Sequence, residues 1–181
     1  MANSDPRVLI ICGSESDLAV MTDACRALDR FAIGWEMHVS SAHRAPERTT
    51  ALARTAEAEG FAAVIAGAGL AAHLPGVVAS CTYLPVIGVP LASGPLQGAD
   101  ALHAVVQMPK GIPVATVAIG GDWNAGLLAA QIVARADGRV RAAFEHYREE
   151  LTRAVEETDE RVQTEFAAGP PGGGVLTAPR T

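Results

Sequence analysis

The chain has 181 residues and a mass of 18.7 kDa, which is enough for one domain with its own core and too short for two of ordinary size. Hydrophobic residues make up 49% of the sequence and charged residues 19%, which excludes disordered, collagen-like and coiled-coil proteins. The formal net charge is -6, the start of the chain is polar, and no apolar run is long enough to cross a membrane. We therefore expect a cytoplasmic protein with no nucleic-acid or membrane partner.

Short apolar runs that end in glycine- or serine-containing turns alternate with segments of helical spacing. Such runs predict strands buried on both faces. Because each crossover is long enough for a helix, the alternation predicts a three-layer flavodoxin-like α/β sandwich with a parallel sheet of about five strands. The expected strands are residues 8–12, 35–39, 62–66, 85–89 and 114–119, and the expected helices are residues 18–28, 46–58, 71–80, 99–106 and 124–134.

After Ala136 the pattern changes to one long amphipathic helix, expected over residues 139–166. Its apolar stripe either folds back on its own domain or packs on a neighbouring subunit. Residues 168–181 have too little apolar, periodic content to order themselves. The sequence therefore predicts a single α/β domain, residues 1–167, followed by a disordered tail. The stripe consists of Val140, Phe144, Tyr147, Leu151 and Val155.

Ligands of an open parallel sheet bind beyond the carboxyl ends of its strands, so the loops after the first three strands form the candidate site. The first loop, GSESD at residues 13–17, joins a strand to a helix. Free backbone N–H groups at such a junction suit an anion, typically phosphate. Ser16 or Asp17 can instead simply cap the helix, because capping and phosphate binding use the same residue types. Both interpretations of this loop stay open.

The second loop, SSAHRAP at residues 40–46, brings hydroxyls, an imidazole and a guanidinium together. Arg44 can hold a phosphate by a bidentate fork. His43 can exchange a proton near neutrality, since an unperturbed imidazole has a pKa of about 6.5. The alternative is a solvated loop with an incidental histidine.

The third loop, GAGLAAHLPG at residues 67–76, is almost bare of side chains before His73, so a ligand can lie directly against its backbone. We expect His73 in the first turn of a helix, where the helix dipole favours a neutral, hydrogen-bonding imidazole. The alternative is a tight turn needed only for packing.

Metal ligation has no support in the sequence. Cys12, Cys25 and Cys81 have long, irregular spacings that fit neither a disulfide framework nor a CxxC site, so we expect reduced thiols. There is no HxxxH motif and no cluster of Asp and His. We therefore expect a protein without a metal ion.

Taken together and in this order, GSESD, VSSAHRAPE and AGAGLAAHLPG resemble the class I PurE family, the N5-carboxyaminoimidazole ribonucleotide mutases of purine biosynthesis. PVIGVPL, SGPLQGADALHAVVQMPKGIPVATVAI and NAGLLAAQIVA are similar to the same family, so the resemblance covers residues 8–134. It implies a homo-octamer with sites at subunit junctions, which gives the C-terminal helix a place to pack.

The activity that the resemblance implies is an isomerisation, in which a carboxylate moves from the exocyclic amine of an aminoimidazole ribonucleotide to the ring carbon. The family route is decarboxylation with carbon dioxide held in place, attack of the ring carbon on it, and loss of the ring proton. No metal, biotin or ATP takes part, so no cofactor is expected.

The site residues are carried over from the same resemblance. The family's proton-transfer histidine corresponds to His43. The contacts to phosphate and ribose correspond to Ser14, Asp17, Ser41 and Arg44, and the backbone wall around the migrating carboxylate corresponds to Gly69, Ala71, His73 and Leu74.

One position departs from the family, which commonly has a second glycine where this chain has Leu70. We expect this side chain to point away from the site. Two alternative functions stay open. One is an aminoimidazole ribonucleotide carboxylase that shares the fold and takes free carbon dioxide, and the other is a non-catalytic phosphate- or flavin-binding module.

Overall fold

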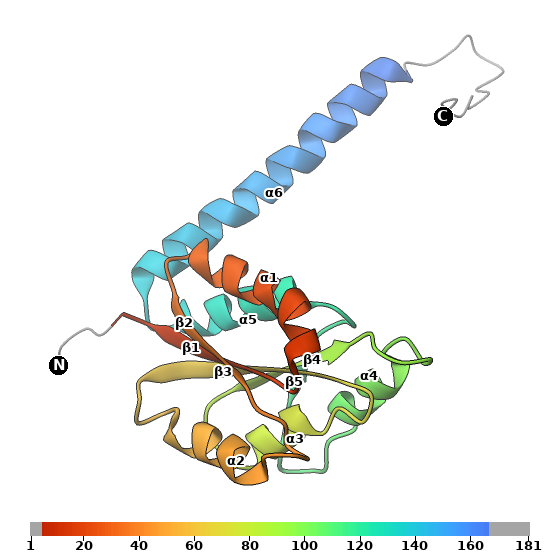
Figure 1. The fold of residues 1–181 in the computed structure, drawn as a ribbon. Coiled ribbons are helices and arrows are strands. Elements are labelled where there is room, and N and C mark those ends of the chain that lie inside the picture. Colours follow the sequence, from red (N-terminus) through yellow and green to blue (C-terminus); the bar gives the residue numbers. More distant parts are fainter. Residues whose placement is uncertain (1–4, 167–181) are drawn as a thin grey trace. The chain divides into compact units, whose positions relative to one another are not determined.

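The computed structural model describes residues 5–166. Five strands form one parallel sheet in the order β2-β1-β3-β4-β5 (Figure 1). This is the flavodoxin-like order, in which the strand order reverses at the point where β1 lies beside β3. The strands are β1 (Arg7–Cys12), β2 (Gly34–Val39), β3 (Phe61–Gly69), β4 (Val86–Leu91) and β5 (Ala115–Thr116).

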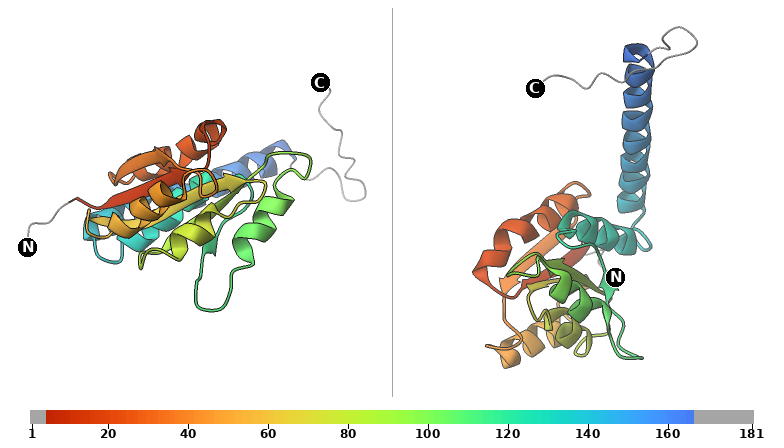
Figure 2. Two further views of the ribbon diagram at one scale, coloured as in Figure 1. Left: turned by 60° about the horizontal axis from the view of Figure 1, so that its bottom comes forward. Right: turned by 90° about the vertical axis from the view of Figure 1, so that its right-hand side faces the viewer.

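Helices cover both faces of the sheet (Figures 1 and 2). α1 and α5 pack on each other and on one face, whereas α2, α3 and α4 lie on the other. The predicted three-layer α/β sandwich is therefore confirmed. The helical elements are the 3-10 turn η1 (Glu15–Asp17), α1 (Leu18–Asp29), α2 (Pro46–Thr55), α3 (Leu74–Ala79), α4 (Ala99–Val106), α5 (Asp122–Val133) and α6 (Gly138–Glu165).

Small aliphatic residues fill the core on both sides of the sheet. Successive residues of a strand point to opposite faces, so Leu9 and Ile11 of β1 join the apolar cluster under α2, α3 and α4. Val8 and Ile10, fully buried as well, face the α1 and α5 layer. A Cβ on Gly67 of β3 would overlap the Met21 side chain of α1. Close approach of the layers therefore depends on small residues, in keeping with the low aromatic content.

The prediction that all strands are buried on both faces is wrong for β2. Trp35 and Val39 are 40% and 41% exposed. The reason is the strand order, because β2 lies at the edge of the sheet and pairs with β1 alone among the described strands. The indole of Trp35 donates a hydrogen bond to the carboxylate of Asp29 at 2.7 Å, which satisfies its polar atom at this edge.

Three elements are shorter than expected. The helix predicted over residues 46–58 ends at Thr55. The strand predicted over residues 114–119 is reduced to Ala115–Thr116, which pairs with Ile87 and Gly88 of β4. The helix predicted from residue 71 begins at Leu74, because residues 70–73 form a turn. This turn is part of the candidate site.

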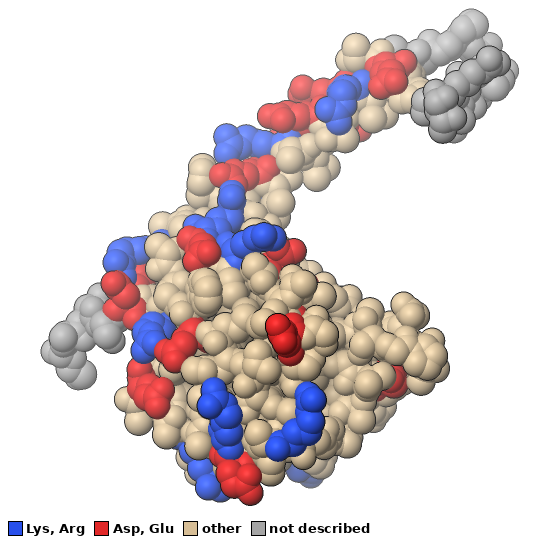
Figure 3. All heavy atoms as spheres, viewed as in Figure 1, with Lys and Arg blue, Asp and Glu red and all other residues tan. Residues whose placement is uncertain are grey.

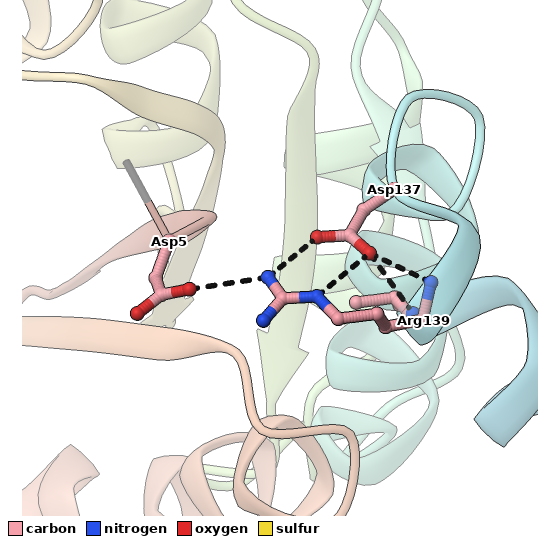
Figure 4. A network of polar contacts seen from close by, with 4 residues as sticks. Asp5, Asp137 and Arg139 are labelled. Carbon is pink, nitrogen blue, oxygen red and sulfur yellow. Dashed lines mark hydrogen bonds and ion pairs between the residues drawn. The ribbon is translucent and has the colours of Figure 1, made fainter. Parts of the chain in front are cut away.

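The first turn of α6 is fixed by Asp137 (Figure 4). Its carboxylate accepts hydrogen bonds from the backbone N–H groups of Arg139 and Val140, at 2.8 and 3.3 Å. Arg139 Nη2 also donates to Asp137 at 3.0 Å and to Asp5 at 3.1 Å. The hydrogen bond from Arg139 holds the pKa of Asp137 below its usual value. The sequence Asp137-Gly138-Arg139 thus starts the helix by capping.

The described residues divide into two compact units, 5–144 and 145–166, with the boundary inside α6. In the first unit Val140 is buried and Phe144 stacks on Phe31 with ring centroids 5.3 Å apart. Of the two alternatives left open for the stripe, these two residues follow the fold-back on their own domain. In the second unit Leu151 and Val155 are exposed, so packing on a neighbouring subunit stays a prediction for them.

The single domain expected over residues 1–167 also stays a prediction, and the tail expected over residues 168–181 lies outside the described residues. Over residues 5–166 no helix is both long and apolar enough to span a membrane. On the face shown in Figure 3, basic and acidic side chains are intermingled rather than gathered into a basic surface.

Candidate active site

A cleft of about 600 Å³ opens at the carboxyl ends of the strands, where the loops after β1, β2 and β3 meet. Every residue that the sequence suggested as catalytic or substrate-binding lines this cleft. Doubly wound sheets bind ligands at this edge, beside the reversal of strand order, which here falls between β1 and β3. The structure therefore brings the predicted residues together in one cleft, while the site itself and the role of each residue stay predictions.

The first loop is closed by its own side chains. Ser14 has an extended backbone, and its N–H donates a hydrogen bond to Asp17 Oδ2 at 2.9 Å. The hydroxyls of Ser14 and Ser16 lie 2.6 Å apart. Asp17 precedes α1 but makes no side-chain hydrogen bond to the backbone of that helix; with Ser14 it forms a capping box at the short η1 turn. Ser14 and Ser16 both line the cleft, where their hydroxyls suit an anion.

The second loop is held against α2 by hydrogen bonds. The hydroxyls of Ser40 and Thr49 form a buried hydrogen bond of 2.8 Å, and Ala45 N–H donates to Ser41 O at 2.8 Å. Pro46 occupies the first turn of α2, as predicted, where its missing N–H costs nothing. These contacts fix the backbone that carries His43 and Arg44.

Arg44 bridges the first and second loops. Its Nη2 donates to the carbonyl of Gly13 at 3.1 Å, and its Nε donates to Ser41 Oγ at 3.3 Å. No carboxylate within residues 5–166 forms an ion pair with it. A guanidinium that is exposed, oriented and not neutralised is well placed to accept an anionic ligand.

The third loop makes two consecutive tight turns. Ala72 N–H donates to Leu70 O and His73 N–H donates to Ala71 O, both at 2.8 Å. Leu74 follows at the start of α3 and is 2% exposed, so it ties the loop to the core. Gly69 and Ala71 leave the cleft wall almost bare of side chains, as the sequence suggested.

Leu70 adopts φ = 53°, the left-handed region that glycine enters freely and an L-residue enters at a cost of roughly 1–2 kcal/mol. This backbone geometry gives a physical reason why a glycine suits the position. The Leu70 side chain lies toward Gly94 in the loop after β4 and is 52% exposed, and Leu70 also lines the cleft.

The two histidines of the cleft form a pair that sequence reasoning did not foresee. His43 Nε2 lies 2.9 Å from His73 Nδ1, and the rings meet edge to face with centroids 4.9 Å apart. His73 is the N-cap residue of α3 rather than a residue of its first turn. A hydrogen bond between two imidazoles needs one nitrogen with a proton and one without, so the pair is suited to carry a single proton between them.

Two further findings concern the Cys12 thiol and the side chains that could bind a metal ion. Burial raises the pKa of the Cys12 thiol to about 11, and the negative charge of Asp17 acts in the same direction. This cysteine is therefore a neutral thiol at physiological pH. Within residues 5–166 no group of three or more His, Cys, Asp or Glu side chains is arranged to hold a metal ion.

Ser93 also lines the cleft, although the sequence-based prediction of the site did not include it. It comes from the loop after β4, whereas the prediction covered the loops after the first three strands. The same rule about carboxyl ends of parallel strands applies to β4 and would have pointed to it.

A doubly wound parallel sheet with a cleft at its carboxyl edge, lined by loops suited to an anion and by a histidine pair, is the architecture of a ligand-binding α/β protein. The model of the AIR carboxylase family matches residues 7–154. This match covers most of the chain, and the protein belongs to that family.

Among its relatives, the N5-carboxyaminoimidazole ribonucleotide mutase of Pyrococcus abyssi is 53% identical over 148 residues, which are 82% of this chain and 85% of that protein. The mutase of Mycobacterium tuberculosis strain H37Rv is 50% identical over 162 residues, 90% of this chain and 93% of its own length. The phosphoribosylaminoimidazole carboxylase of Schizosaccharomyces pombe is 49% identical over 158 residues. This chain spans 29% of that longer protein.

Solved structures agree with these sequence relationships. Treponema denticola PurE superposes with a TM-score of 0.80 at 29% identity, covering 87% of this chain and 99% of that one. A variant of Treponema denticola PurE2 gives a TM-score of 0.82 at 28% identity, covering 88% of this chain and 99% of that one.

Proposed function

We propose that this protein is an N5-carboxyaminoimidazole ribonucleotide mutase of purine biosynthesis, with His43 as its proton carrier. About 50% identity over about 90% of the chain to mutases supports the activity. The observation that supports the role of His43 is its place in the cleft, hydrogen-bonded to His73. The substrate is a ribonucleotide, and no cofactor takes part in the proposal.

The polar residues of the cleft suggest how such a substrate lies. Arg44 with the hydroxyls of Ser14 and Ser41 provides charge and donors for the phosphate. Asp17 provides a carboxylate for ribose hydroxyls, which are hydrogen-bond donors. With the phosphate at the loops after β1 and β2, the imidazole extends toward the third loop, where the wall is formed by Gly69 and its neighbours.

The chemistry requires one proton to be delivered and one to be removed. Cleavage of the N–C bond releases carbon dioxide and leaves the electron pair on the amine nitrogen, which accepts a proton from His43. The electron-rich ring carbon then attacks the retained carbon dioxide, and His43 takes the proton that the ring carbon loses. Protons and electrons balance over the cycle, so the net reaction is an isomerisation. General acid–base catalysis of this kind contributes roughly 10²–10⁴-fold in rate.

His73 supports this cycle as a positioning residue. Its Nδ1 lies 2.9 Å from His43 Nε2, within hydrogen-bond distance, and this contact orients the His43 ring. Backbone hydrogen bonds hold His73 itself, because its N–H donates to Ala71 O and its carbonyl accepts from Val77 N–H.

A second candidate function is aminoimidazole ribonucleotide carboxylase activity, which uses free carbon dioxide. The description of the family and the Schizosaccharomyces pombe relative favour it. Assays with the two substrates separate the candidates. We expect turnover of N5-carboxyaminoimidazole ribonucleotide at low bicarbonate. Turnover found solely with aminoimidazole ribonucleotide and bicarbonate would establish the carboxylase, and turnover with neither would favour a non-catalytic phosphate- or flavin-binding module.

The family resemblance also supports assembly as a homo-octamer in the cytoplasm. Leu151 and Val155 present apolar surface on α6 that a neighbouring subunit can cover. Light scattering after size exclusion tests this: eight times the 18.7 kDa chain mass is expected, and a monomer mass would contradict it.

A further inference from the structure

Ser93 stands at the end of the cleft opposite to Arg44. It follows β4 by two residues, and the strand order places β4 beside β3 and away from β2. Because all strands are parallel, the loops that carry Arg44 and Ser93 leave the sheet at the same edge. A ligand anchored at Arg44 and laid along this edge therefore extends toward Ser93.

The side chain of Ser93 packs directly against the backbone of the third loop. A Cβ built on Gly69 would overlap Ser93 Oγ and would lie 3.0 Å from Ser93 Cβ. The hydroxyl therefore occupies the space that a side chain at residue 69 would need. This gives Gly69 a specific reason to be glycine, since its φ is not in the left-handed region.

The hydroxyl of Ser93 has no hydrogen-bond partner within the part of the chain that the structure describes. It is half-buried and lines the cleft beside Ala68, Gly69 and Leu70, which offer no side-chain donor. A partly buried hydroxyl in an otherwise apolar wall is satisfied by water or by a ligand.

The loop that presents Ser93 is well fixed. Gly94 and Gly98 adopt left-handed φ values of 69° and 88°, and Gln97 Nε2 donates to Gly94 O at 3.1 Å. A Cβ on Gly94 would lie 2.6 Å from Leu70 Cδ2, so the third loop and the loop after β4 touch at this point. Ser93 is thus held in place by its own loop and by the neighbouring one.

We propose that Ser93 is a substrate-binding residue that donates a hydrogen bond to the migrating carboxylate. This inference rests on the proposed mutase function. A hydroxyl is a suitable donor to a carboxylate oxygen, both on the exocyclic amine before transfer and on the ring carbon after it. Ser93 forms and breaks no covalent bond, and its contribution is to hold the one-carbon group against the bare wall at Gly69.

The test compares two ribonucleotides that differ by this carboxylate. In calorimetry, Ser93→Ala is expected to weaken binding of the carboxylated product, 4-carboxy-5-aminoimidazole ribonucleotide, by roughly 10- to 100-fold. Affinity for aminoimidazole ribonucleotide, which lacks the carboxylate, is expected to stay within about twofold. Ser80→Ala is the matched control, because its exposed hydroxyl donates to Val77 O outside the cleft. This control is expected to change neither affinity.

Gly69→Ala provides a second variant, because the new methyl group displaces the Ser93 hydroxyl without removing it. The same selective loss of product affinity is expected. Equal losses for both ribonucleotides, or unchanged product affinity in Ser93→Ala, would overturn the assignment. If the wild-type protein converts the substrate and Ser93→Ala binds the product normally, only the proposed role of Ser93 is refuted. Wild-type protein that binds neither ribonucleotide refutes the proposed function and the Ser93 assignment together.

Discussion

Replacement of Arg44 by alanine separates phosphate binding from the stability of the fold. Arg44 is exposed, and its guanidinium makes two hydrogen bonds of 3.1 and 3.3 Å and has no ion-pair partner within residues 5–166. Its partners, Gly13 O and Ser41 Oγ, can bond to water after truncation. We therefore expect the free energy of unfolding to change by less than about 1 kcal/mol.

The cost to ligand binding is larger. A hydrogen bond to a charged group contributes about 1.5–3 kcal/mol, so loss of the guanidinium fork weakens ribonucleotide binding roughly 10- to 150-fold. Calorimetry with aminoimidazole ribonucleotide and with its nucleoside, which lacks the phosphate, isolates this effect. The nucleoside should bind wild type and Arg44→Ala with similar affinity.

Arg44→Lys is the matched control for charge without the planar fork, and we expect an affinity between those of wild type and alanine variant. An equal loss for nucleotide and nucleoside would refute the phosphate role, because the effect would then come from displaced loops. Unchanged nucleotide affinity would remove Arg44 from the site.

Two further predictions concern the fold. Gly88→Ala should lower the free energy of unfolding, measured in urea, by about 1–3 kcal/mol, because the new Cβ overlaps Val105 and lies 2.8 Å from Val114 Cγ1. Gly138→Ala is the control, because its new Cβ meets open space, and it should be neutral or stabilising. Equal effects of the two substitutions would contradict the packing argument. Burial, aided by Asp23, raises the pKa of Asp122, whose Oδ2 lacks a partner among residues 5–166. The neutral carboxyl of Asp122 contributes its full stabilisation below the unfolded pKa of 3.8. This stabilisation is lost as pH rises through the higher pKa of the folded state. Asp122→Asn should therefore raise the melting temperature at pH 7 but not below pH 3.8, and a gain independent of pH would contradict this origin.

Much of the fold follows from local patterns. The alternation of apolar runs and helical segments predicts the parallel sandwich, and glycine- and serine-bearing turns mark the loops of the cleft. β2 is the informative exception: its apolar residues resemble those of a buried strand, but Trp35 and Val39 are exposed at the sheet edge. Edge position depends on strand order, which the pattern within one strand does not encode.

The site was predictable as a set of loops but not as a set of contacts. His43 and His73 are 30 residues apart in sequence and belong to loops after strands that are separated by β1 in the sheet. Their hydrogen bond depends on how far each loop reaches across β1, which no spacing reveals. Ser93 was missed for a different reason, since the prediction stopped at the loops after the first three strands and Ser93 follows β4.

In the proposed reaction His43 carries the proton between the amine nitrogen and the ring carbon. His43→Asn keeps a polar side chain beside His73 but removes the titrating group, so single-turnover conversion of N5-carboxyaminoimidazole ribonucleotide measures the claim directly. We expect the rate to fall at least roughly 10²-fold, with ribonucleotide affinity within about tenfold of wild type. Conversion at the wild-type rate would contradict this role of His43.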